Sequence, residues 1–130
     1  MAWLLDTSVA IHLRDSSALE DRLADLDERP ALSAVSRVEL ENGVYRHPRW
    51  TAVRRATLDA MLTRMDTLDF GAEAIAAYRA IVAAAGYSRG RTLDRMIGAT
   101  AIAHGLRLVT LNGRDFRDIP GLDLEVWPTP

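Results

Sequence analysis

The sequence predicts an α/β fold in which helices cover both faces of a parallel sheet. Short apolar runs alternate along the chain with longer segments whose apolar residues recur at helical spacing, the pattern typical of βαβ units. The 130 residues are 48% hydrophobic, which is enough to bury one core. No linker, repeat or low-complexity tract divides the chain, so we expect one domain over residues 1–130.

The strands of this sheet are expected at the short apolar runs. The first run ends directly in Asp6, and the fourth, which is the clearest, ends in a turn that contains Asn112 and Gly113. Because each run is only a few residues long and is followed by polar residues, it fits a buried strand of a parallel sheet better than a helix. The runs predict four to five strands, at Trp3–Leu5, Ala31–Leu32, Leu68–Phe70, Leu106–Leu111 and Leu124–Trp127.

The helices are expected between these strands. Leu19, Leu23 and Leu26 recur at helical spacing in the first long segment, and a dense run of alanines fills a later one. Gly86 and Gly105 stand where two of the helices end, as is typical of C-terminal caps. One predicted helix begins near Ser8, and the others cover residues 18–26, 36–45, 51–65, 72–85 and 92–104.

The composition excludes several kinds of chemistry. All 16 basic residues are arginine, and the chain contains neither lysine nor cysteine. Phosphate-binding loops with a lysine, Schiff-base chemistry, thiolate nucleophiles, cysteine-ligated zinc and disulfides are therefore excluded. The N-terminus lacks a signal-peptide pattern and no apolar stretch is long enough to cross a bilayer, so we expect a cytoplasmic protein with no membrane association.

Four carboxylates are expected at one edge of the sheet. Asp6 and Asp115 follow strands, whereas Glu39 and Asp94 lie in the first turns of helices whose N-termini face the same edge. Ionised carboxylates that converge repel one another unless a cation neutralises them, and Mg²⁺ or Mn²⁺ is the natural oxygen-liganded choice. Such an ion activates water for attack on a phosphodiester, so the pattern indicates metal-dependent phosphodiester hydrolysis.

Each of these acids also has a purely structural interpretation. Asp6 is a possible helix N-cap, and Ser36 with Glu39 matches the spacing of a capping box. Asp94 suits the positive end of a helix dipole, and Asp115 suits a turn in which Asp118 is equally acidic. The functional interpretation therefore depends on their being brought together in the fold.

The chain resembles the PIN-domain family, and in particular the VapC-type toxins of bacterial toxin–antitoxin pairs. Four short motifs carry the resemblance and occur in the family's order along essentially the whole chain. They are Leu4-Leu5-Asp6-Thr7-Ser8, the segment 33–40 around Glu39, the segment 91–106 around Asp94, and the segment 108–116 that ends in Asp115-Phe116.

The resemblance implies a three-layer α/β/α PIN-like domain with endoribonuclease activity that depends on Mg²⁺ or Mn²⁺ and leaves a 5′-phosphate. It implies that Asp6, Glu39, Asp94 and Asp115 are both the catalytic residues and the metal ligands, with Ser8 beside the metal as a supporting or substrate hydroxyl. It leaves open whether Asp115 or one of Asn112 and Asp118 completes the site. The implied partners are a VapB-type antitoxin and a second copy of the chain, which would form a homodimer.

The charge is unevenly distributed along the chain. Residues 15–28 contain six acids and one arginine, whereas residues 86–120 contain six arginines and three aspartates. Arginines of the basic segment suit RNA phosphates or an acidic antitoxin tail, and some are expected to be ordinary surface charges. The substrate-binding set predicted here is Ser8, Asn112, Arg91, Arg95 and Arg114.

Two other functions are compatible with parts of the pattern. A catalytically inactive PIN-like domain that binds RNA or protein would keep the acids for folding and would show no metal-dependent turnover. A receiver or phosphatase domain that uses Asp6 as phosphoryl acceptor is disfavoured, because such sites generally use a lysine. The favoured hypothesis is a toxin endoribonuclease.

Overall fold

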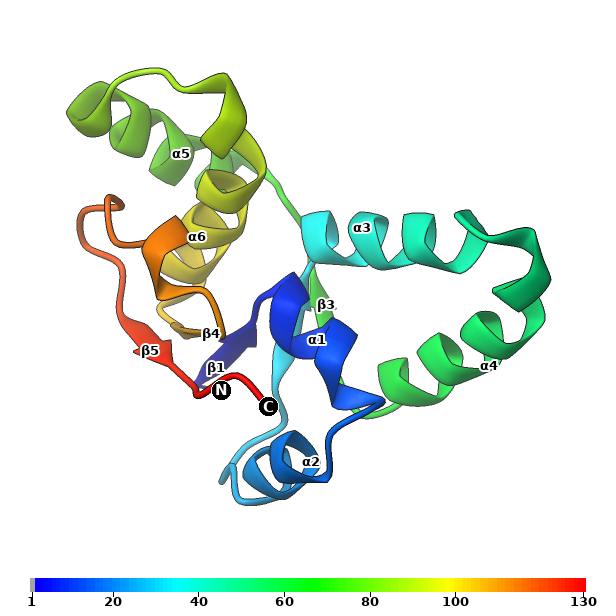
Figure 1. The fold of residues 1–130 in the computed structure, drawn as a ribbon. Coiled ribbons are helices and arrows are strands. Elements are labelled where there is room, and N and C mark those ends of the chain that lie inside the picture. The colour runs from blue at the N-terminus through cyan, green and yellow to red at the C-terminus, as the bar shows by residue number, and fades with distance from the viewer. Residues whose placement is uncertain (1) are drawn as a thin grey trace.

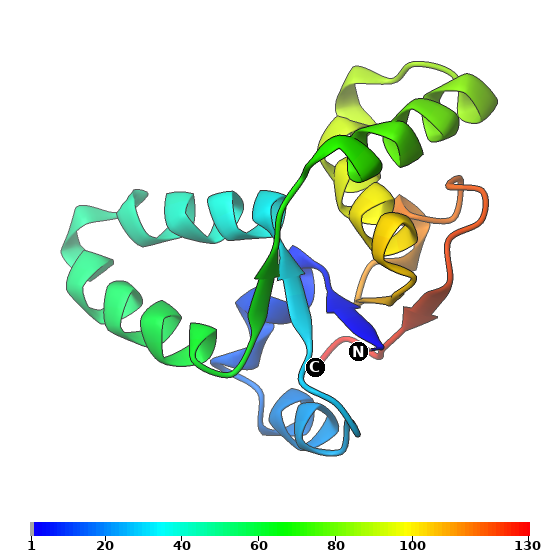
Figure 2. The ribbon, with the colours of Figure 1, turned by 180° about the vertical axis from the view of Figure 1, so that it is seen from behind.

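The centre of the molecule is a five-stranded parallel sheet. A computed structural model describes residues 2–130; Met1, the first residue of the predicted domain, lies outside them. The strands follow the order β3-β2-β1-β4-β5, so that the N-terminal strand lies in the middle. They are β1 (Trp3–Leu5), β2 (Ala31–Ser33), β3 (Asp66–Leu68), β4 (Arg107–Thr110) and β5 (Leu124–Val126). Figure 2 shows β2 and β3 side by side at one edge of this sheet.

Within residues 2–130, six α-helices connect the strands and confirm the predicted order of elements. The helix over 72–85 and the helix over 92–104 begin and end at the predicted residues, and Gly105 adopts the left-handed conformation expected of a cap. The helices are α1 (Thr7–Leu13), α2 (Ser17–Ala24), α3 (Ala34–Tyr45), α4 (Thr51–Leu62), α5 (Ala72–Ala85) and α6 (Thr92–His104). Three short 3₁₀ turns complete the chain: η1 (Pro48–Trp50), η2 (Arg89–Arg91) and η3 (Gly113–Asp115).

The third strand lies two residues earlier than the sequence predicts. The apolar run suggested Leu68–Phe70, whereas β3 spans Asp66–Leu68 and pairs with β2 from Ala31 onwards. This strand is at the edge of the sheet, where Asp66 and Thr67 are both exposed, so polar residues are accepted. Arg29 donates to Asp66 over 3.0 Å and helps fix this register.

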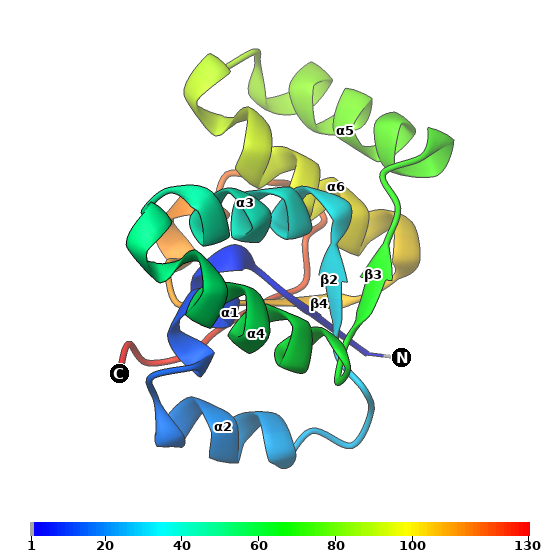
Figure 3. The same ribbon diagram turned by 90° about the vertical axis from the view of Figure 1, so that its right-hand side faces the viewer.

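The sheet is buried on both faces, which makes the fold three-layered. Leu4 and Leu5 are adjacent and fully buried, yet they belong to different cores because successive residues of a strand face opposite sides. Leu5 packs with residues of α1, α2, α3 and α4, whereas Leu4 packs with residues of α5 and α6. Figures 1 and 3 show these two groups of helices on opposite sides of the strands. The predicted α/β/α architecture is confirmed.

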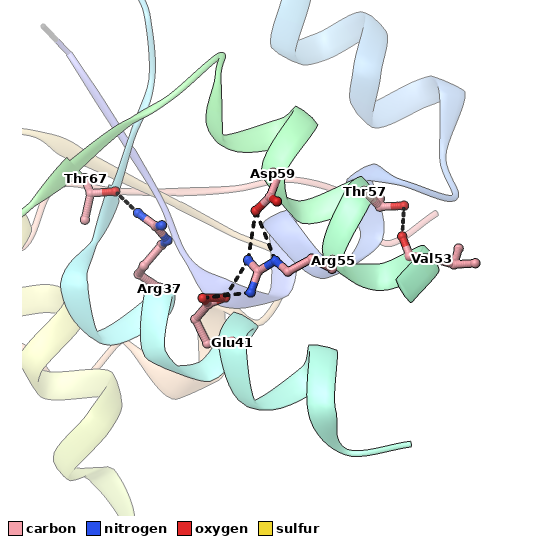
Figure 4. A network of polar contacts seen from close by, with 7 residues as sticks. All are labelled: Arg37, Glu41, Val53, Arg55, Thr57, Asp59 and Thr67. Carbon is pink, nitrogen blue, oxygen red and sulfur yellow. Dashed lines mark hydrogen bonds and ion pairs between the residues drawn. The ribbon is translucent and has the colours of Figure 1, made fainter. Parts of the chain in front are cut away.

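Helices α3 and α4 form a hairpin that extends away from the sheet (Figure 1). Arg55 of α4 contacts both carboxylate oxygens of Glu41 on α3, at 3.1 and 2.8 Å, and also Asp59 one turn further along α4. At the base of the hairpin, Arg37 donates to Thr67 of β3 over 3.1 Å. Figure 4 shows this network, which fixes α3 against both α4 and the sheet.

Candidate active site

The carboxyl ends of β1, β2 and β4 meet at one edge of the sheet, and the predicted acids lie there. β1 leads into Asp6, β2 leads into α3 with Glu39, and β4 leads into η3 with Asp115. Helix α6 runs antiparallel to the strands, so its first turn brings Asp94 to the same edge. We call these four residues, Asp6, Glu39, Asp94 and Asp115, the acidic cluster.

Asp6 is buried and held by three donors. Its Oδ1 accepts from the Val9 amide at 3.1 Å and from the Ser8 hydroxyl at 2.6 Å, and its Oδ2 accepts from the Thr110 hydroxyl at 2.5 Å. Burial raises the pKa of Asp6 above its usual value, and the hydrogen bonds from Ser8 and Thr110 oppose that shift. Asp6 is thus the N-cap of α1, as one interpretation predicted, but only one of its three bonds is the capping bond.

Glu39 is held by a threonine and does not form the capping box that its spacing suggested. The N-cap of α3 is Ser33, whose side chain accepts from the Ser36 amide at 3.0 Å, so Ser36 lies inside the helix. The Glu39 carboxylate accepts instead from the Thr7 hydroxyl at 2.6 Å. This bond joins α3 to the first residue of α1 and directs the carboxylate toward the sheet edge where Asp6 lies.

The pKa of Asp94 shows that the other three acids lie close to it. Its pKa is raised from 3.8 to about 6, first by burial and then by the negative charges of Asp115, Glu39 and Asp6, while Arg91 lowers it. The fold therefore brings the four carboxylates into one electrostatic neighbourhood. Within residues 2–130, no three histidine or acidic side chains lie close enough together to hold one ion in this arrangement.

The substrate-binding residues predicted from the sequence have different surroundings. Arg91, Asn112 and Arg114 are exposed around the acidic cluster, on η2 and the turn after β4. Ser8 is committed within the protein, since its hydroxyl donates to Asp6 and accepts from the Leu111 amide at 3.2 Å. Arg95 requires a correction: its side chain is only 3% exposed, so it is not available to an RNA phosphate.

The structure also indicates which acid of the last motif faces the cluster. Asp115 is exposed, and its negative charge contributes to the raised pKa of Asp94. Asp118 instead lies between two arginines, with Arg95 at 3.0 Å and Arg91 at 3.3 Å. A carboxylate paired with two guanidinium groups is a poor ligand for an added cation. The geometry therefore favours Asp115 over Asp118 as the fourth acid.

Sequence reasoning missed two residues of the site. Thr110 ends β4 and donates to Asp6, and Thr7 follows Asp6 and donates to Glu39. Both are hydroxyl residues at the carboxyl ends of central strands, the positions where ligands of open sheets bind. That signal was available in the sequence, but which acid each hydroxyl would contact depends on the strand order.

Replacing Asp94 with asparagine is expected to raise the melting temperature at about pH 7.5 in a buffer free of divalent cations. Because the folded pKa is about 6 against an ordinary value of 3.8, the folded state holds this proton more tightly, and ionisation costs stability as the pH rises through that window. Asparagine removes this cost, so the gain should vanish near pH 4. Thermal melts of both proteins from about pH 4 to 8 measure the effect.

The control for these melts is Asp25→Asn, which removes an exposed acid at the end of α2. Its melting temperature should follow that of the wild type at every pH. A constant difference between Asp94→Asn and the wild type over this range would contradict the raised pKa.

Comparison with known proteins identifies similar sequences and structures. The family model for the PIN domain matches residues 3–122. The chain is 30% identical to ribonuclease VapC2 of Rickettsia felis and 27% identical to the tRNA(fMet)-specific endonuclease VapC of Shigella flexneri, with 98% of both chains covered in each case. Among solved structures, it is similar to VapBC2 of Rickettsia felis bound to promoter DNA, with a TM-score of 0.86, 28% identity and coverage of 98% and 99%. DNA-bound VapBC of Salmonella typhimurium also gives a TM-score of 0.86, with 26% identity and 98% of both chains covered.

Proposed function

The chain belongs to the PIN domain family, and from this premise we propose that it is a toxin endoribonuclease that hydrolyses RNA phosphodiester bonds with the help of a divalent metal ion. The observation that carries the proposal is the acidic cluster, in which burial and the charges of the other three acids raise the pKa of Asp94 to about 6. Its relatives are named as ribonucleases and endonucleases, and the similar solved structures are toxin–antitoxin complexes.

The chemistry of the donors in the cluster fits Mg²⁺ or Mn²⁺, and within residues 2–130 these side chains would have to move closer together to hold one ion. These ions prefer carboxylate oxygens, and the chain offers four carboxylates at one edge, while it contains no cysteine that would favour a softer metal. Burial and the negative charges of Asp115, Glu39 and Asp6 raise the pKa of Asp94 more than Arg91 lowers it, and a bound cation would oppose this shift. We propose Asp6 and Asp94 as the principal ligands, with Glu39 and Asp115 completing the site.

When bound, the metal would supply activation of water and neutralisation of charge at phosphorus. The chain's own residues prepare this chemistry. The hydroxyls of Ser8 and Thr110 fix both oxygens of Asp6, and Thr7 fixes Glu39, so these carboxylates are oriented before any substrate arrives. Asp6, Glu39 and Asp94 also lie directly after a strand or in the first two turns of a helix, which keeps their backbone rigid, whereas Asp115 lies in η3.

Exposed arginines around the cluster are suited to the RNA backbone. Arg91 and Arg114 are both exposed, and Arg91 is close enough to influence the pKa of Asp94. Guanidinium groups bind phosphates through two parallel hydrogen bonds, so they would hold phosphates next to the scissile bond. We keep Asn112, which is exposed between β4 and η3, as a further candidate contact.

The same proposal includes a VapB-type antitoxin, and the structure offers a groove for it. The groove between α1, α3 and α4 has a volume of about 240 Å³. Its floor is apolar, its rim is basic, and Glu39 of the acidic cluster lies at its wall, so a bound segment would reach the catalytic edge. The residues that define the floor are Ala10, Leu40, Val44, Leu58 and Met61, and those of the rim are Arg14, Arg46, His47 and Arg54. An amphipathic helix with acidic residues fits this chemistry.

Ile11→Glu is expected to weaken antitoxin binding at least about 10-fold, because it places a charge in the path of an apolar anchor. Ile11 lines the groove and is 45% exposed, so the substitution leaves the core intact. Affinity measured by calorimetry with the purified antitoxin checks this. The matched control is Ile75→Glu on α5, where the isoleucine is 53% exposed outside the groove. Equal affinities of both variants would contradict the assignment of the groove.

A second copy of the chain is the other proposed partner. Val38 of α3 and Leu93 of α6 are 60% and 51% exposed, so they leave apolar side chains that a dimer would cover. No helix of residues 2–130 has both the length and the apolar character needed to span a membrane.

The proposed function also suggests where the protein acts. A ribonuclease that meets its substrate after transcription acts in the cytoplasm, where we place this protein.

A further inference from the structure

A buried arginine next to the acidic cluster has a role that the proposed chemistry does not explain. Arg95 follows Asp94 in α6, and its side chain is 3% exposed. One terminal nitrogen donates to the Gly86 carbonyl at 2.5 Å and the other to Asp118 at 3.0 Å, while Nε has no hydrogen-bond partner among the described residues. Burying a guanidinium is costly unless it is paired, so the pair with Asp118 is needed to keep Arg95 in the interior.

The partner of Arg95 lies in the turn that carries Asp115. This turn leaves β4, forms η3 and continues through Asp118 and Ile119, and Figure 1 shows it in orange beside α6. A second contact holds it there: a Cβ added at Gly98 of α6 would lie 2.7 Å from Cδ1 of Ile119. The turn and the helix therefore touch at two points, one ionic and one apolar, about one helical turn apart on α6.

We propose that the Arg95–Asp118 pair is a positioning element of the acidic cluster, because it fixes the turn that carries Asp115 against the helix that carries Asp94. These two acids come from segments that are 21 positions apart in the sequence and share no strand pairing. Ile119 anchors the turn further from the site, whereas the ion pair acts three positions after Asp115 and one after Asp94. The inference rests on the proposed function, since it concerns the spacing of the proposed metal ligands.

The test is the double variant Arg95→Met/Asp118→Leu. It replaces both charges with apolar side chains, so that no lone charge remains buried, and such replacements generally preserve folding. We expect Mn²⁺ affinity, measured by calorimetry on the full chain, to fall about 10-fold, the size of effect typical of residues that orient metal ligands. The kcat for RNA cleavage should fall by at least about 10-fold, with KM changed less than about twofold.

Two further variants test whether the loss of Mn²⁺ affinity is specific to the Arg95–Asp118 pair. Arg64→Met/Glu20→Leu removes an exposed ion pair of 2.8 Å between the turn after α4 and α2, and it should change neither Mn²⁺ affinity nor kcat. Because Arg91 also loses its partner in the test variant, the comparison is repeated in an Arg91→Met background, where the loss of Mn²⁺ affinity should persist. A loss that disappears in this background would overturn the positioning role.

A folded double variant with unchanged Mn²⁺ affinity and kcat would also overturn the proposal. If the double variant does not fold, Asp118→Asn takes its place, because asparagine keeps the shape of a side chain that is 32% exposed and can still accept the hydrogen bond from Arg95, while the ionic attraction is lost. A folded Asp118→Asn protein with wild-type Mn²⁺ affinity again overturns the proposal. A wild-type chain that binds Mn²⁺ but cleaves no RNA would refute the proposed function alone, since the affinity comparison still tests the positioning role.

Discussion

Asp94→Asn is expected to lower the rate of RNA cleavage at least about 100-fold, an effect comparable with removing one group that stabilises transition-state charge. Asparagine has almost the same shape as aspartate but carries no negative charge, so it is a much weaker ligand for a hard cation. Asp94 is also the acid whose pKa reports all three other members of the cluster, so its charge is central to the site.

The measurement is cleavage of an RNA pool by the purified chain in the presence of Mg²⁺ or Mn²⁺, followed by gel analysis over time. Asp6→Asn should show a similar loss, because Asp6 is the acid most firmly held by hydroxyl donors. Asp25→Asn serves again as the exposed control and should cleave at the wild-type rate. Cleavage that survives in both cluster variants would refute the proposed function, and RNA binding without turnover in the wild type would favour an inactive binding domain.

The order and type of the elements were predictable because each has a strong local signal. The alanine-rich segment 72–85 and the glycines at 86 and 105 define their helices without help from the rest of the chain. β3 was not located correctly, because its position is set by pairing with β2 and by Arg29, and its own residues Asp66 and Thr67 carry no apolar signal. Edge strands depend on neighbours that a local pattern does not reveal.

The neighbourhood of the four acids was predictable from topology, but their individual contacts were not. Strand ends and helix starts indicated that Asp6 and Glu39 share one edge of the sheet. The spacing of Ser36 and Glu39 then suggested a capping box, whereas Ser33 caps the helix and Thr7 binds Glu39. Several residues near a helix start are able to cap it, and the choice depends on where the strand ends.

The prediction that Arg95 binds substrate was wrong for a related reason. Its sequence neighbours are a cluster acid and a basic segment, which indicated phosphate binding. Its side chain instead turns into the protein, because Asp118 and the Gly86 carbonyl provide partners there. Whether an arginine faces solvent or the interior depends on partners that are distant in the sequence, here 23 positions in the case of Asp118.

Leu5→Ala and Leu4→Ala are each expected to reduce the free energy of unfolding by about 2–5 kcal/mol, the range for removing a buried leucine side chain. Both leucines are fully buried on the central strand, but Leu5 lies in the core with α1 to α4 and Leu4 in the core with α5 and α6. Urea denaturation measures each loss separately. Val53→Ala, at a position that is 61% exposed on α4, should change stability by less than about 0.5 kcal/mol.

Alanine substitutions at two adjacent positions can both reduce the free energy of unfolding this much only if the sheet is covered on both faces, because successive side chains of a strand face opposite sides. A loss below about 1 kcal/mol at either leucine would therefore contradict one of the two cores.

The two leucine variants also test how the sheet supports the acidic cluster. β1 lies between β2 and β4, and all three strands end at the acidic cluster, so a cavity on either face weakens the sheet that holds these acids in place. Neither leucine is a member of the cluster, so kcat measured well below the melting temperature should stay within about twofold of the wild type, which separates loss of stability from loss of chemistry.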